Sequence, residues 1–168
     1  MNMATVVFTC GDDVSTDVIY PGRYMATVLP SETPQFAFAD TPEFNAKLKS
    51  GEIKAGSVIV GGKNFGCGSS REQAVSTLKG YDLIIVAGSF ARIFLQNSIN
   101  LGLRLVTAPG FSAQVGDTLD ITETAVVNRT SGASIPIVQL PAARKAIIDA
   151  GGLIPYTRRL MLERSGQA

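Results

Sequence analysis

Residues 57–72 read Ser57-Val58-Ile59-Val60-Gly61-Gly62-Lys63-Asn64-Phe65-Gly66-Cys67-Gly68-Ser69-Ser70-Arg71-Glu72. They begin with a short apolar run that is typical of a buried strand, and they continue through a stretch rich in glycine. The positions that follow repeat apolar side chains at helical spacing, at Ala74, Val75 and Leu78. A strand, a glycine-rich turn and a helix in direct succession predict one unit of a parallel α/β fold.

The sequence downstream repeats this alternation. Residues 83–87 are all apolar, as expected of a central strand in a parallel sheet. A second helix is expected to begin at Ser89, to carry Ile93 on its apolar face and to end at Gly102. Residues 103–106 then predict another strand.

The sequence upstream supplies a further strand and a helix. Residues 5–9 are rich in β-branched side chains and predict a strand, whereas residues 14–24 are expected to form a loop or turn. Thr41 followed by Pro42 is typical of a helix start, and Gly51 ends that helix.

The last third of the chain follows a different pattern. Short β-rich runs predict antiparallel strands that cover residues 119–122, 125–128 and 136–138. Pro141 opens a further helix, residues 156–164 extend the helical region, and residues 165–168 are expected to fray. Without an internal repeat or a low-complexity linker, the sequence predicts a single domain over residues 1–168.

Composition narrows the class of partner. A formal net charge of +1 on 168 residues gives no general basic field for nucleic acid or for an anionic membrane. The N-terminus reads as a strand rather than a signal peptide, and no apolar run approaches the roughly 20 residues of a membrane helix. We therefore expect a cytoplasmic protein that contacts neither a membrane nor nucleic acid.

Cysteine and histidine usage excludes several chemistries. With two cysteines and no histidine, the chain cannot form a Ser-His-Asp or Cys-His catalytic group by itself. The same counts provide too few ligands for a zinc site or for an iron–sulfur cluster held by this chain alone. We therefore expect this chain to bind no metal.

The glycine-rich turn instead predicts an anion site. Glycines such as Gly68 let the backbone approach a ligand closely, and the free N–H groups of a helix start attract negative charge. The hydroxyls of Ser69 and Ser70 accompany them, and Arg71 could bind a carboxylate through two parallel hydrogen bonds. The simpler alternative is that one of these serines caps a helix and Arg71 is solvated. Cys67 is either a low-pKa thiol or merely a small residue in a tight turn.

Three better-known glycine-rich motifs fit poorly. A dinucleotide-binding fingerprint would place a third glycine where Arg71 stands. A phosphate-binding P-loop would require Ser or Thr instead of Asn64 after Lys63. The spacing of a nucleophile elbow is also absent around Ser69 and Ser70.

Three segments in order, residues 13–24, 61–72 and 89–94, resemble the aconitase superfamily, and most closely the separate small subunits of 3-isopropylmalate dehydratases. The resemblance covers nearly the whole chain. It implies a swivelling β/β/α domain with a mixed, partly parallel sheet and flanking helices. It also implies that a large subunit, a second chain, carries a [4Fe–4S] cluster and completes the active site.

The resemblance also implies roles for individual residues. Ser69 matches the serine that acts as the catalytic base. Ser70 and Arg71 match contacts to a substrate carboxylate, in a substrate-binding turn that includes Cys67 and Gly68. Asp17 matches an acidic residue that orients a histidine, which here belongs to the large subunit; alternatively, Asp17 caps a turn. Arg92 is a candidate either for the supporting shell or for a surface position.

Substrate choice within this family is expected in the loop formed by Tyr24, Met25, Ala26 and Thr27. Relatives that act on substrates with a distal carboxylate place an arginine near Ala26, and this chain has none there. We expect Met25 and Ala26 to line an apolar pocket for a branched alkyl group. Arg23 is expected to be structural, and Gln73 departs from the histidine found in many relatives.

These features predict a small subunit of a hydro-lyase that interconverts 2-isopropylmalate and 3-isopropylmalate in leucine biosynthesis, acting on hydroxy-dicarboxylates or hydroxy-tricarboxylates. Another alkyl-malate, such as citramalate or dimethylmalate, or homoaconitate is an alternative substrate. Two alternatives come from other classes: a non-catalytic anion-binding module and a dinucleotide-binding oxidoreductase domain.

Overall fold

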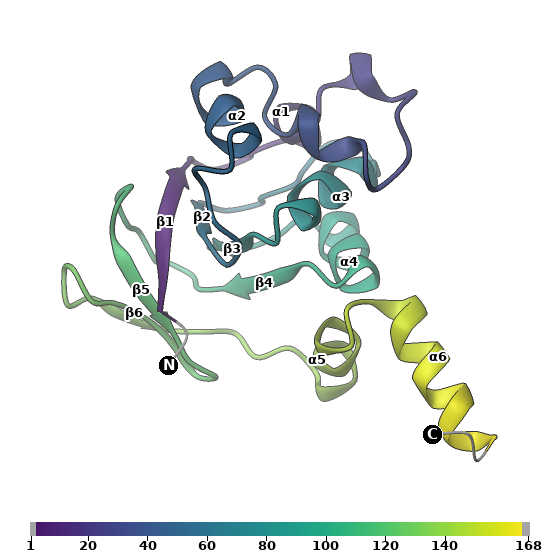
Figure 1. Cartoon of the computed structure of the whole chain (residues 1–168). Coiled ribbons are helices and arrows are strands. Elements are labelled where there is room, and N and C mark those ends of the chain that lie inside the picture. Colours follow the sequence, from purple (N-terminus) through teal and green to yellow (C-terminus); the bar gives the residue numbers. More distant parts are fainter. Residues whose placement is uncertain (1–2, 166–168) are drawn as a thin grey trace.

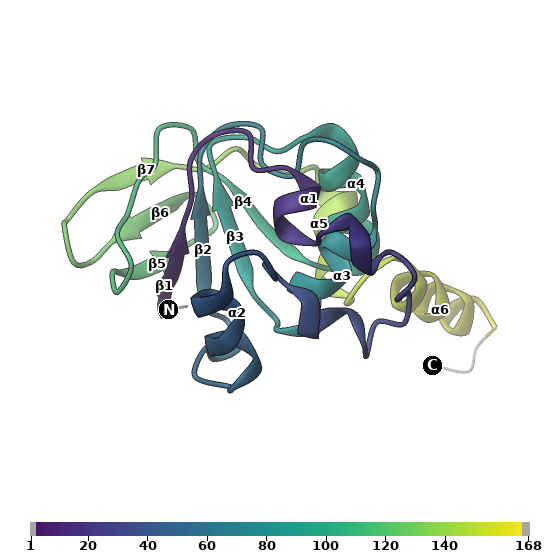
Figure 2. The ribbon, with the colours of Figure 1, turned by 90° about the horizontal axis from the view of Figure 1, so that it is seen from above.

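The first strand of the chain lies in the middle of a seven-stranded sheet with the order β4-β3-β2-β1-β5-β6-β7 (Figures 1 and 2). This arrangement comes from a computed structural model, which describes residues 3–165. The strands are β1 (Met3–Thr9), β2 (Val58–Gly61), β3 (Ile84–Ala87), β4 (Arg104–Thr107), β5 (Thr118–Ile121), β6 (Ala125–Asn128) and β7 (Ser134–Pro136).

The sheet is parallel on one side of β1 and antiparallel on the other. β1, β2, β3 and β4 run in the same direction, with Val58, Ile84 and Arg104 in register. On the other side, β1 pairs antiparallel with β5, and β5, β6 and β7 form a meander. The predicted mixed, partly parallel sheet is thus confirmed.

Helices cover one face of the parallel half (Figure 1). The helices between residues 3 and 165 are α1 (Thr16–Ile19), α2 (Pro42–Lys49), α3 (Gln73–Gly80), α4 (Arg92–Leu101), α5 (Ala142–Asp149) and α6 (Leu153–Arg164), with short 3-10 turns at Gly22–Tyr24 and Thr33–Phe36. The last helix, α6, extends away from the sheet towards the C-terminus (Figures 1 and 2).

The two faces of the sheet bury two separate apolar cores. Successive side chains of a strand point to opposite faces. Ile59 and Ile85 accordingly pack against the helices, in a cluster that includes Leu78 of α3 and Phe94 of α4. The intervening residues, Val58, Val60, Ile84 and Val86, pack with Leu119, Ile121 and Val126 of the antiparallel half. The sheet therefore curls so that its antiparallel half covers its parallel half.

Most predicted elements are present, but several expectations are wrong in detail. The segment expected as a loop at residues 14–24 contains the short helix α1. Helix α4 begins after Ala91 rather than at Ser89, because the Ser89 hydroxyl instead accepts the N–H of Asn64 at 2.9 Å. Ile93, expected on the apolar face of this helix, is exposed.

The C-terminal region departs from expectation by only a few residues. The last strand, β7, covers Ser134–Pro136 instead of residues 136–138. Pro141 precedes α5 as its cap, and the predicted final helix begins at Leu153. Of the segment expected to fray, Ser165 forms the C-cap of α6, and residues 166–168 lie outside the described part of the chain.

Three loops lie together at the carboxyl ends of the parallel strands, and backbone hydrogen bonds join them. The loop after β1 pairs with the loop after β2 through the Gly66 N–H to the Val14 carbonyl, 2.7 Å, and the Thr16 N–H to the Cys67 carbonyl, 2.8 Å. The loop after β3 joins them through the Phe65 N–H to the Ser89 carbonyl, 3.0 Å. This edge of a parallel sheet is where such folds commonly bind ligands.

Between residues 3 and 165, none of the helices combines the length and the apolar character that crossing a membrane requires.

Candidate active site

The glycine-rich turn after β2 needs two of its glycines for defined reasons. Gly66 and Gly68 have φ angles of +81° and +94°, which side-chain-bearing residues rarely adopt. A Cβ added at Gly66 would overlap the Phe94 ring of α4. A Cβ added at Gly68 would lie 3.4 Å from the Thr16 hydroxyl. The turn can therefore pack closely against both α4 and the loop after β1.

The helix that was expected to begin within this turn starts later. Glu72 is the N-cap of α3 and Gln73 its first residue, so neither Ser69 nor Ser70 caps a helix. Up to that point the chain is not helical, and two hydrogen bonds tie it to other segments: the Asn97 amide donates to the Ser70 carbonyl at 3.2 Å, and the Ser69 N–H donates to Thr16. Since the helix dipole acts only near the first turn, the dipole of α3 contributes little at Ser69.

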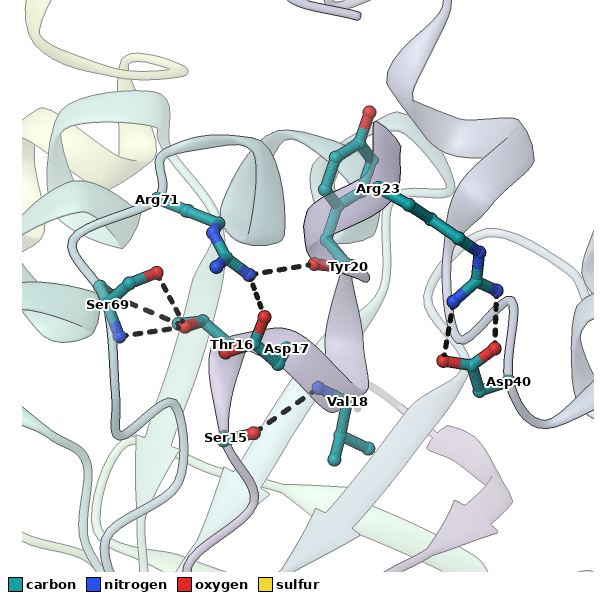
Figure 3. A network of polar contacts seen from close by, with 9 residues as sticks. All are labelled: Ser15, Thr16, Asp17, Val18, Tyr20, Arg23, Asp40, Ser69 and Arg71. Carbon is teal, nitrogen blue, oxygen red and sulfur yellow. Dashed lines mark hydrogen bonds and ion pairs between the residues drawn. The ribbon is translucent and has the colours of Figure 1, made fainter. Parts of the chain in front are cut away.

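Ser69 lies against Thr16, the first residue of α1 (Figure 3). The Ser69 N–H donates to Thr16 Oγ1 at 3.1 Å, and the two hydroxyl oxygens are also 3.1 Å apart. Thr16 is buried, whereas Ser69 is half-buried between exposed Gly68 and exposed Ser70. Buried Thr16 therefore holds Ser69 on its inner side, while the neighbouring residues of the turn are exposed to solvent.

Arg71 is held by the loop after β1. Its Nη1 pairs with the carboxylate of Asp17 and lies 3.5 Å from the Tyr20 carbonyl (Figure 3). Gly22 packs against this pair, since a Cβ there would lie 3.3 Å from Arg71 Nη2. The Arg71 Nε is buried without an acceptor among the described residues. Arg71 is thus fixed next to the turn, and its Nε–H could still donate a hydrogen bond.

Asp17 pairs with Arg71, whereas the turn-capping role considered for it is taken by a neighbouring residue. The N-cap of α1 is Ser15, whose hydroxyl accepts the Val18 N–H at 3.3 Å. Asp17 lies in the first turn of this helix, and its side chain is 56% exposed although it pairs with Arg71. Its carboxylate therefore remains accessible from outside the chain.

The two remaining residues of the predicted turn lie at its margin. Ser70 is exposed, and its carbonyl is the group that Asn97 holds. Cys67 is half-buried, with its Sγ 3.3 Å from the Asp13 carbonyl, to which it donates. The other cysteine, Cys10, lies on the apolar core, and burial raises the pKa of its thiol to about 11.

The expected specificity loop is anchored at both ends and exposed in the middle. The hydroxyl of buried Tyr20 lies 3.1 Å from the Tyr24 carbonyl and 3.3 Å from the Thr27 carbonyl. Between these anchors, Met25 and Ala26 are exposed. The side chain of Gln73 reaches the Met25 carbonyl at 3.5 Å, which gives this residue a contact with the loop.

Arg23 has a structural role, as expected. Its guanidinium lies 4.7 Å from the centroid of the Tyr24 ring, and that ring stacks on Phe36. It also forms a two-armed ion pair with Asp40 (Figure 3), with Nη1 3.0 Å from Oδ2, and this pair lowers the pKa of the Asp40 carboxyl. Arg23 is thus engaged within the chain.

Sequence reasoning missed two side chains that the structure brings to this site. Thr16 and Asn97 contact Ser69 and Ser70, from the loop after β1 and from α4. Thr16 stands directly before Asp17 in the segment that carries the resemblance, so its position was a usable signal. Asn97 lies in the middle of a helix and gives no comparable signal. Arg92 is exposed at the first residue of α4, outside the contacts around Ser69.

A hollow of the described residues lies away from Ser69. It has a volume of about 760 Å³ between β4, β5 and α5, and its walls carry two ion pairs, Arg129–Asp120 and Lys145–Glu123. The surface around Ser69 is open instead, which leaves room for a second chain to form an opposite wall. Within residues 3–165, no three Cys, Asp or Glu side chains are gathered to hold a metal ion.

This chain is similar to known proteins in both sequence and fold. Residues 19–109, just over half of the chain, match the family described as the aconitase C-terminal domain. The isopropylmalate/citramalate isomerase small subunit of Methanocaldococcus jannaschii is 44% identical over 163 residues, covering 94% of each chain. The 3-isopropylmalate dehydratase small subunit of Moorella thermoacetica is 41% identical over 157 residues, covering 90% of this chain and 92% of that one.

A solved structure agrees with these relatives. The crystal structure of 3-isopropylmalate dehydratase from Methanocaldococcus jannaschii has a TM-score of 0.86 to this chain and 36% sequence identity, and it covers 99% of both chains. The matched family segment contains the glycine-rich turn and α4. The chain therefore belongs to the aconitase superfamily and, within it, to the small subunits of isopropylmalate dehydratases.

Proposed function

We propose that this chain is the small subunit of a hydro-lyase that interconverts 2-isopropylmalate and 3-isopropylmalate through a dehydrated intermediate. The observation that carries the proposal is the convergence of Ser69, Arg71 and Asp17 at the carboxyl edge of the parallel strands. Ser69 and Arg71 come from the loop after β2 and Asp17 from the segment after β1, and backbone hydrogen bonds join the two segments. One hydroxyl, one guanidinium and one accessible carboxylate suit a substrate that carries carboxylates and loses a proton.

In this proposal, Arg71 binds a substrate carboxylate and places the carbon next to that carboxylate near Ser69. The Ser69 oxygen, in its charged form, takes the proton from this carbon, and the electrons of the C–H bond form the double bond as the neighbouring hydroxyl leaves. A serine hydroxyl is a weak base in water, so its charged form needs donors and a cation nearby. The guanidinium of Arg71 supplies the cation.

The rest of the active site belongs to a second chain. The proposed partner is a large subunit with a [4Fe–4S] cluster, whose iron supplies a Lewis acid for the leaving hydroxyl. Asp17, exposed beside its pair with Arg71, is the group that would orient a histidine of that subunit. The open surface around Ser69 supports such a shared site.

The specificity loop supports an alkyl-malate substrate. The side chains at its exposed centre, Met25 and Ala26, carry no charge, and Arg23 is engaged with Asp40. An uncharged loop suits an isopropyl group better than a distal carboxylate. Citramalate is the second candidate substrate, because it is named for the Methanocaldococcus jannaschii relative.

The test is to co-express the chain with its large subunit and to assay the hydration of isopropylmaleate and of citraconate. We expect turnover only in the presence of both chains. Ser69→Ala should lower kcat by about 10²- to 10⁴-fold, which is the usual contribution of a general base, and should leave subunit assembly intact. A chain that binds carboxylates but never assembles with a cluster-bearing subunit would support the non-catalytic module instead.

A further inference from the structure

We propose that Thr16 is a positioning residue for the reaction, because its hydroxyl donates a hydrogen bond to Ser69 Oγ and stabilises the charged form of that serine. This inference rests on the proposed function of Ser69 as the base. It assigns a task to a buried side chain whose polar contacts, among residues 3–165, are all with Ser69.

Thr16 has one hydroxyl proton and two possible acceptors on Ser69. Its oxygen accepts the Ser69 N–H at 3.1 Å, which leaves the proton free to point elsewhere. The Ser69 carbonyl lies at 3.4 Å and the Ser69 Oγ at 3.1 Å. The nearer acceptor is therefore the oxygen that is proposed to take the substrate proton.

The hydrogen bond between the two hydroxyls changes with the charge of Ser69. A neutral Ser69 can donate to Thr16 or accept from it. Once Ser69 has lost its proton, only Thr16 can donate, and a hydrogen bond to a charged oxygen is stronger than one between neutral groups. The contact therefore favours the charged form of Ser69 and lowers its pKa.

Thr16 is well placed for this because it cannot move away. It is 1% exposed, and its own N–H donates to the Cys67 carbonyl at 2.8 Å, within the same turn as Ser69. Gly68 leaves the space that the hydroxyl occupies, since a Cβ there would lie 3.4 Å from Thr16 Oγ1. A donor fixed in advance costs no reorganisation when charge develops.

The experiment compares Thr16→Val with Thr16→Ser in the assembled two-chain enzyme. Valine has nearly the shape of threonine without the hydroxyl, whereas serine keeps the hydroxyl. We expect Thr16→Val to lower kcat by roughly 10- to 100-fold with KM within about twofold, since a hydrogen bond to a charged group is lost. The acidic limb of its kcat against pH should move up by about one to two pH units.

Thr16→Ser should keep the wild-type pH profile. A purely structural role predicts a lower kcat without movement of the limb, and that result would overturn the inference. The same holds if Thr16→Ser behaves like Thr16→Val. If Thr16→Val fails to assemble, Thr16→Ala removes the same hydroxyl from a smaller side chain, and its pH profile is judged in the same way.

Ser69→Ala separates this inference from the proposal on which it rests. If Ser69→Ala remains active, the assignment of the base fails and the role of Thr16 fails with it. If Ser69→Ala is inactive while Thr16→Val has wild-type kcat and pH profile, only the role of Thr16 is rejected.

Discussion

Asp17 and Arg71 form an ion pair although they stand 54 positions apart in the sequence. The pair joins the loop after β1 to the loop after β2, and it fixes the guanidinium more firmly than the carboxylate, since the side chains are 16% and 56% exposed respectively. Arg71 is thus immobilised within the chain, while Asp17 still faces outward.

Replacing Arg71 with lysine should weaken substrate binding. An ammonium group keeps the charge but loses the planar fork that can contact a carboxylate and Asp17 at the same time. We expect KM to rise about 10-fold or more, equivalent to the loss of one charge-assisted hydrogen bond. Steady-state kinetics of the assembled enzyme measure this, with Arg158→Lys on exposed α6 as the matched control. An unchanged KM would argue against a carboxylate contact.

Replacing Asp17 with asparagine should affect both kinetic constants. The variant keeps the shape of the side chain but loses the charge that fixes Arg71 and that would orient a histidine of the large subunit. We expect kcat to fall by about 10- to 100-fold, as for other groups that position catalytic residues. Asp82→Asn, at the opposite edge of the sheet, is the control. Wild-type kinetics in Asp17→Asn would exclude both roles.

Introducing an arginine at Ala26 tests the specificity loop. A guanidinium at this exposed position could bind a distal carboxylate, so the ratio of kcat/KM for homoaconitate over isopropylmaleate should rise by about 10-fold or more. Ala55→Arg adds the same charge before β2, away from the site, and should leave the ratio unchanged. Equal ratios in the two variants would place substrate selection outside this loop.

Replacing Gly66 with alanine should destabilise the chain by about 2–5 kcal/mol. A positive φ costs a non-glycine residue about 1–2 kcal/mol, and overlap with the Phe94 ring adds about 1–3 kcal/mol. Gly132 has the same φ of +81° with nothing within 4 Å, so Gly132→Ala isolates the backbone cost. Thermal unfolding should show a larger loss of Tm at position 66. Equal losses would mean that the turn can move away from Phe94.

The two cysteines should differ in reactivity towards a maleimide at neutral pH. Burial raises the pKa of the Cys10 thiol to about 11, so very little of the reactive thiolate is present there. We expect one adduct, located on Cys67 by mass spectrometry and absent from Cys67→Ser. The large subunit with substrate bound should slow this labelling. Modification of Cys10 at the same rate would contradict the burial of its thiol.

Local signals made much of the fold predictable. The apolar residues of β2 and β3, the helix start at Pro42 and the helix end at Gly102 each depend on neighbours in the sequence, and each is present in the structure. Helix α4 was placed too early because the Ser89 hydroxyl bonds to a different loop instead of capping a helix. Contacts of that kind join distant segments and leave no local pattern.

The sequence motifs predicted those residues of the candidate site that belong to the motifs themselves. Ser69, Arg71 and Asp17 do lie together, although their roles remain predictions. The helix start was expected too near Ser69, because the sequence does not reveal that Asn97 and Thr16 bind this turn through hydrogen bonds. Hydrogen bonds between side chains and a different loop can be identified only when the folded arrangement of the strands is known.

The central position of β1 has a consequence during synthesis. This strand leaves the ribosome before the other strands of the sheet, yet Met3 pairs with Asp120 of β5. At translation rates of about 5–20 residues per second, β1 must wait on the order of ten seconds for that neighbour. Until then, one edge of β1 and the second apolar face of the parallel strands are uncovered. The nascent chain is therefore most exposed to aggregation before its antiparallel half emerges, and slower translation of that half would lengthen this interval.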